Sequence, residues 1–205
     1  MTRATRDHGA DSTDLLAELD HLQGLLLECR AVFPTMTVEM IGQRQFSTAP
    51  YYQRRGYKAQ VRLEQPITED FIKRQRQLGR WINENALIRL FGILNYRGLF
   101  QKLDKSLPGY AEMDILRRIR NALTKTPLDY QPEVGENLKL RDAVVQHFAL
   151  GEHDIQEQIP IPINKVIDPI FEACRNYIRA FEQAHNNRME PTRDVTRHRA
   201  AHSKR

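Results

Sequence analysis

Apolar residues recur every three or four positions along most of this chain, which is the period of an amphipathic helix. The clearest stripe lies near the C-terminus and comprises Val166, Ile167, Ile170, Cys174, Tyr177, Ile178 and Phe181. Similar stripes occupy residues 12–33, 68–97, 111–125 and 137–150. Each needs a neighbour on which to bury its apolar face. The pattern therefore predicts an all-α fold, a bundle of four to six helices.

Capping and helix-breaking residues set the expected helix ends. Thr68, which precedes two acidic residues, is a good N-cap for the longest helix, which should end near Gly98. Asn137 is expected to cap a later helix and Gly151 to end it. Pro169 lies inside the last stripe, so we expect a kink near the start of that helix.

One short segment departs from the helical period. From Tyr57 to Glu64, apolar and polar residues alternate, which is typical of a half-buried strand, and Gly56 offers a turn before it. A partner strand is expected within residues 36–46. Together they predict a small β-hairpin near 36–64, beside the helices.

Length and composition indicate one globular domain. The chain has 205 residues, of which 40% are hydrophobic and 28% charged, enough for a single core. We expect a single helical domain at 12–185, a flexible N-terminus at 1–11 and a disordered basic tail at 186–205. The tail is expected because its Asn, Arg, Pro, His and Ser offer little to bury.

Several classes of protein are disfavoured. No apolar run approaches the roughly 20 residues that cross a bilayer, and residues 1–11 lack the apolar core of a secretion signal. The two cysteines, Cys29 and Cys174, have no neighbouring ligands at metal spacing. Nucleotide-binding glycine motifs are also lacking. We therefore expect a cytoplasmic protein that has no membrane partner and binds no metal or cofactor.

The charge is segregated along the chain. Residues 1–43 carry three basic and seven acidic residues (net −4), and residues 44–102 carry twelve and four (net +8). Residues 103–185 carry ten and thirteen (net −3), and residues 186–205 carry six and two (net +4). Two interpretations of the basic central block are open: a surface that faces RNA, or a partner for the acidic flanks within the fold.

A short motif follows the fourth apolar stripe. Residues 120–125 read RNALTK and stand between that stripe and a loop rich in Pro and Gly. The motif resembles the Arg-Asn-x-x-x-His motif of the HEPN superfamily, with Lys125 in place of the histidine. The order of helix, motif, loop, helix, loop and long final helix is similar to that family over about residues 67–184. The resemblance implies a HEPN-like helical bundle.

The resemblance also implies a site. In catalytic members of the family the Arg and His form a metal-independent ribonuclease centre, so Arg120, Asn121 and Lys125 are the corresponding catalytic candidates here. A guanidinium can bind phosphate oxygens with two donors. Histidine exchanges protons near neutral pH, whereas lysine, with an ordinary pKa of about 10.4, is an ammonium that cannot accept a 2′-hydroxyl proton.

Three functions remain open at this point. The first is a HEPN-like RNA-associated protein of the stress or phage-defence type, with endoribonuclease activity impaired or lost. The second is a non-catalytic helical module for protein interaction or dimerisation. The third is an active metal-independent endoribonuclease that uses Arg120 and Lys125. The family resemblance further implies a homodimer, with a cognate antitoxin or nucleotidyltransferase as a possible partner.

Two further groups of residues are candidates. His147 follows Arg141 by six positions and is the alternative base, although a histidine at the edge of the core is the simpler interpretation. Aromatic and basic residues also interleave at 46–58 and 73–81, a mixture that suits single-stranded RNA but equally suits a hairpin packed on a solvated helix. The RNA-binding candidates are Arg54, Arg55, Lys58, Lys73, Arg74, Arg76 and Arg80.

Overall fold

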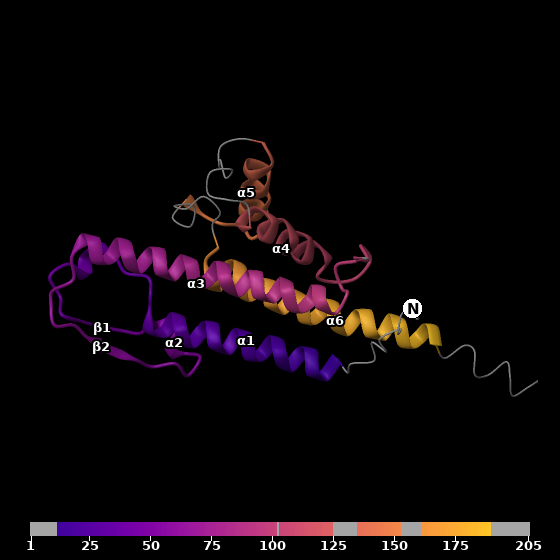
Figure 1. Cartoon of the computed structure of the whole chain (residues 1–205), viewed down its shortest axis with the longest axis horizontal. Helices are drawn as coiled ribbons and strands as arrows, with labels where there is room; N and C mark the ends of the chain where they lie inside the picture. The colour runs from indigo at the N-terminus through magenta and orange to yellow at the C-terminus, as the bar shows by residue number, and fades with distance from the viewer. Residues whose placement is uncertain (1–11, 102, 125–134, 153–160, 190–205) are drawn as a thin grey trace, which may run out of the picture.

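The computed structural model describes residues 12–101, 103–124, 135–152 and 161–189, and helices predominate in these ranges (Figure 1). The sheet structure of the described ranges consists of two short strands. This confirms the predicted all-α bundle with a small hairpin. No helix within these ranges combines the length and the apolar character needed to cross a membrane. Residues 1–11 and 190–205, which include most of the predicted tail, lie outside the described ranges.

Three long helices run side by side and form the body of the molecule (Figure 1). They are α1 (Ser12–Val32), α3 (Glu69–Tyr96) and α6 (Asp168–Met189). Helix α1 contacts both α3 and α6, and α4 (Tyr110–Leu123) packs against α3 and α6. Helix α5 (Glu136–His147) packs on α4. The end of α6 lies four residues beyond position 185, at which the sequence analysis ended the domain.

The apolar stripes meet in one main core. Many side chains with no more than 2% exposure come from α1, α3, α4 and α6, and they include Leu19, Leu87, Leu90, Leu94, Met113, Leu116, Ile119, Phe171 and Tyr177. Most of the predicted C-terminal stripe is buried here, whereas Phe181 is 39% exposed. Burial of this kind contributes about 25 cal/mol per Å² of apolar surface, which makes helix packing the main source of stability.

The hairpin is smaller than the alternating sequence suggests. Strand β1 (Gln45–Ser47) pairs antiparallel with β2 (Gln60–Arg62), and Phe46 lies opposite Val61. Between them lies a single turn of helix, α2 (Pro50–Gln53). A 3-10 turn, η1 (Val38–Met40), precedes the sheet. A second, small apolar cluster lies under this region and consists of Met36, Phe46, Ile67 and Ile72.

The start of α3 agrees with the predicted cap. The Thr68 hydroxyl accepts a hydrogen bond from the Phe71 amide at 3.2 Å, which satisfies one of the free donors of the first turn. The helix ends at Tyr96, close to the predicted Gly98, which adopts a φ of 76°.

The predicted ends of α5 are wrong. Its N-cap is Gly135, and Asn137 is a buried residue inside the first turn. At the other end Ala149, rather than Gly151, adopts the left-handed conformation, with a φ of 48°. The Ala149 amide donates to Gln146 and the Leu150 amide to Val145, the pattern of a Schellman cap. Burial of the apolar Leu150 therefore sets the helix end, although Gly151 is the residue better suited to a left-handed conformation.

The start of α6 has a π-helical turn, η3 (Ile163–Ile167). The Ile167 amide donates to the carbonyl of Pro162, five residues earlier, at 3.3 Å. Pro169 follows at the second position of α6 and has no amide hydrogen to donate. The expected irregularity near Pro169 therefore takes the form of a wide turn that places Asp168 at the N-terminus of α6.

Gly109 allows α4 to approach α6 closely. It is the N-cap of α4 and has a φ of 84°. A Cβ atom at this position would lie 2.3 Å from the backbone carbonyl oxygen of Ala173 in α6. Only glycine satisfies both the left-handed backbone and the short distance between the two chain segments.

Candidate functional site

Arg120 and Asn121 lie in the last turn of α4 and contact each other. One terminal nitrogen of the Arg120 guanidinium donates to the Asn121 side-chain oxygen at 3.1 Å. The guanidinium carbon lies 5.1 Å from the ring centre of Phe91 on α3, a cation–π contact. Arg120 is half-buried and Asn121 exposed. The ring and the amide thus hold a positive charge in a defined position at the surface.

Thr124 completes the end of α4. Its hydroxyl lies 3.0 Å from the carbonyl oxygen of Arg120 and 3.3 Å from that of Asn121, and donates to them. The free carbonyls at the helix end are thus capped by Thr124, which leaves the Asn121 side chain to orient Arg120. Lys125, the third residue of the predicted site, lies outside the described residues.

His147 lies at the other end of α4. Its Nε2 atom is 2.9 Å from a carboxylate oxygen of Glu112 in the first turn of α4. Its ring also makes an edge contact with Phe148. Glu112 precedes Arg120 by eight residues, about 12 Å along the helix axis. The structure therefore joins His147 to Glu112 and does not bring it together with Arg120 and Asn121.

The predicted RNA-binding residues divide into two groups. Three have partners within the fold: Arg55 pairs with Asp168, Arg76 donates to the Met36 carbonyl oxygen and Arg80 pairs with Glu84. The side chains of the others, Arg54, Lys58, Lys73 and Arg74, are exposed and make no hydrogen bond or ion pair within the described part of the chain. They lie at two places along the chain, shortly after α2 and near the start of α3.

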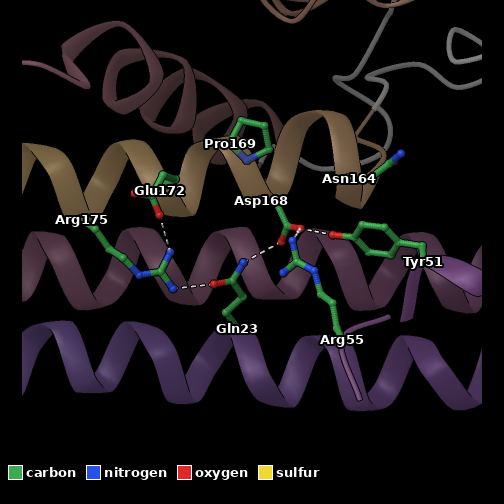
Figure 2. Close-up of a pocket in the computed structure, with 8 residues that line it drawn as sticks. All are labelled: Gln23, Tyr51, Arg55, Asn164, Asp168, Pro169, Glu172 and Arg175. Atoms are coloured by element: carbon green, nitrogen blue, oxygen red, sulfur yellow. Dashed lines mark hydrogen bonds and ion pairs between the residues drawn. The ribbon is translucent and has the colours of Figure 1, made fainter. Parts of the chain in front are cut away.

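A polar network that the sequence analysis did not predict centres on Asp168. Its carboxylate accepts hydrogen bonds from Gln23 of α1 at 2.6 Å and from the hydroxyl of Tyr51 (Figure 2). Arg55, which follows α2, forms an ion pair with it at 2.7 Å and lies over the Tyr51 ring. Three segments distant in sequence thus converge on one carboxylate at the N-terminus of α6.

Arg175 extends this network along α6. It donates to the Gln23 side-chain oxygen at 2.5 Å (Figure 2). It also donates to Asp20 at 2.8 Å. It also lies 3.5 Å from Glu172. Gln23 therefore accepts from Arg175 and donates to Asp168, which fixes the orientation of its amide.

The network lines a surface cavity of about 400 Å³ between α1, α2 and α6. Burial raises the pKa of the Asp168 carboxyl above its ordinary value, opposed by the Gln23 hydrogen bond and by the positive charge of Arg175. The donors around Asp168 thus offset part of the cost of burying its charge. Since each carboxylate and guanidinium here has a partner, the arrangement joins three elements and presents no free catalytic group.

Replacing Asp168 tests this structural role. Asp168→Ala leaves Gln23, Tyr51 and Arg55 without their acceptor, so we expect a loss of about 2 kcal/mol in the free energy of unfolding. The matched control on the same helix is Glu172→Ala, whose carboxylate is 60% exposed and which should change stability by less than about 0.5 kcal/mol. Chemical denaturation of both variants measures the difference, and equal effects would contradict the assigned role.

Sequence spacing gave no signal for the Asp168 network because Gln23 and Asp168 are 145 positions apart. The one available signal was an aspartate directly before a proline at a helix start. Among the described residues, no group of three or more His, Cys, Asp or Glu side chains is arranged to hold a metal ion.

No protein-family model, curated protein or solved structure gives a significant match to the chain.

Proposed function

We propose that this is a HEPN-like RNA-associated protein of the stress or phage-defence type, acting in the cytoplasm, whose endoribonuclease activity is impaired or lost. The observation that carries the proposal is the guanidinium of Arg120, held on the Phe91 ring and by Asn121 at the end of α4. This is the position of the Arg-Asn pair in the motif that the chain resembles.

The surroundings of Arg120 suit a phosphate ligand. Its hydrogen bond to Asn121 uses one of five N–H donors, and no carboxylate within the described residues pairs with it. A charge already held in place loses less side-chain entropy when it binds. Bidentate donation to phosphate oxygens is the interaction that arginine makes best.

The lysine at the last position of the motif supports impaired cleavage. Lys125 replaces the histidine of the motif, and a lysine ammonium can donate a proton but cannot remove one from a 2′-hydroxyl. His147, the alternative base, pairs with Glu112 at the opposite end of α4. The protein is therefore proposed to bind RNA and to cut it slowly or not at all, as a homodimer and with a cognate antitoxin or nucleotidyltransferase as its partner.

RNA binding by two arginine variants of α4 tests the proposal. Arg120→Ala removes the proposed phosphate contact, and Arg117→Ala removes an exposed arginine that pairs with Asp114 on the same helix. We expect Arg120→Ala to weaken binding of a labelled mixed RNA pool about 5- to 100-fold. The slope of log affinity against log salt concentration should also decrease by about one. Arg117→Ala should have little effect.

Circular dichroism controls for folding of both variants. Equal binding by wild-type protein and Arg120→Ala, or equal losses in the two variants, would contradict a phosphate site at Arg120. The better interpretation would then be a non-catalytic helical interaction module.

A further inference from the structure

The first half of α3 presents an exposed face with an unusual composition. Arg74, Gln77 and Trp81 follow one another at i, i+3 and i+7 and so form one stripe, with Lys73 beside it. The opposite face is buried through Ile72, Gly79 and Asn83. Figure 1 shows this part of α3 extending beyond the start of α6, beside the hairpin.

Trp81 is the central feature of this face. It is the only tryptophan in the chain, and its side chain is 61% exposed, whereas tryptophan is on average highly buried. The adjoining Arg80 is held by Glu84 at 2.7 Å, and Asn85 donates to the Trp81 carbonyl oxygen at 2.8 Å. The indole thus stands on a regular, fixed stretch of helix with its ring open to solvent.

Some charged side chains around Trp81 form ion pairs and others do not. Lys73 and Arg74 are exposed and make no ion pair within the described residues. Asp70 is the acidic residue of the same face, and Glu84 is already paired with Arg80. The face therefore offers an aromatic surface and two free cations about 10 Å further along the helix axis.

We propose that this face of α3 binds single-stranded RNA, with a base stacked on Trp81 and neighbouring phosphates at Lys73 and Arg74. Stacking on an aromatic ring beside cations is how proteins bind unpaired strands with little sequence preference. The inference rests on the proposed RNA association and adds a second contact to it. Phe91, which holds Arg120, lies ten residues beyond Trp81, about 15 Å along the same helix and about 80° around it. A strand that follows α3 and winds part of the way around it would meet both contacts.

The single tryptophan provides a direct measurement. The intrinsic fluorescence of the wild-type protein is recorded during titration with a 12-nucleotide single-stranded oligoadenylate. Parallel titrations use a duplex of the same length and inorganic polyphosphate, which has charge but no bases. We expect the single strand to quench the emission and the duplex and polyphosphate to leave it nearly unchanged. Quenching of equal size by polyphosphate would overturn the stacking contact.

Binding of labelled oligoadenylate by variants gives a second readout. Trp81→Leu should weaken binding about 5- to 100-fold, the range for losing one stacked base. Tyr96→Leu removes an aromatic ring of the same helix that is 76% exposed and should leave affinity unchanged. RNA binding that depends on Arg120 but not on Trp81 would overturn this inference and leave the proposed function standing. A protein that binds no RNA would overturn both.

Discussion

Gly109→Ala should lower the free energy of unfolding by about 2 to 4 kcal/mol. About 1 kcal/mol comes from placing alanine at a φ of 84°. The rest comes from overlap of the new methyl group with the Ala173 carbonyl oxygen 2.3 Å away, because α4 and α6 would have to separate and overpacking costs about 1 to 3 kcal/mol.

Gly42→Ala is the matched control. Gly42 has the same φ of 84°, but no atom lies within 4 Å of a Cβ placed there. It should therefore show the backbone cost alone, about 1 kcal/mol. Thermal denaturation should place the melting temperature of Gly109→Ala about 4 to 16 °C below that of wild type. If the two variants are equally stable, α4 and α6 do not approach each other as described.

Local sequence signals predicted the elements whose ends depend on local chemistry. Thr68 and its acidic neighbours predicted the start of α3, and alternation predicted β2, although only Gln60–Arg62 pairs with β1. Asn137 led to a wrong prediction of the start of α5, because its capping preference is a local property and the N-cap is Gly135. At the other end of the helix, Leu150 is buried. Tertiary burial outweighed intrinsic preference at both ends of that helix.

The site was predictable only in part. The motif indicated Arg120 and Asn121, and their contact is present, but nothing in the spacing predicted the Phe91 ring beneath the guanidinium. Similarly, the sequence places Arg55 in a basic stretch, but in the structure its guanidinium forms an ion pair with Asp168. Whether a basic residue is free or paired depends on contacts between distant segments, which periodicity does not encode.

Lys125→His should produce the largest functional change. A histidine at the last motif position supplies a group that can accept a proton near pH 7, and general acid–base catalysis typically contributes 10²- to 10⁴-fold. We therefore expect cleavage of a labelled RNA pool at least about 100-fold faster than by wild-type protein. Because the resemblance implies chemistry without metal, EDTA should not change the rate. Lys125→Gln, which removes the charge without adding a base, serves as the control.

The most direct test of the proposed RNA site at the end of α4 is a comparison of cleavage rates between Lys125→His and the double variant Lys125→His, Arg120→Ala. We expect cleavage by the single variant and its loss in the double variant, because the guanidinium proposed to bind the phosphate is gone. Strong cleavage by wild-type protein that is lost in Lys125→Ala would contradict the claim of impaired chemistry. No cleavage by any variant, together with RNA binding that does not depend on Arg120, would contradict the site itself.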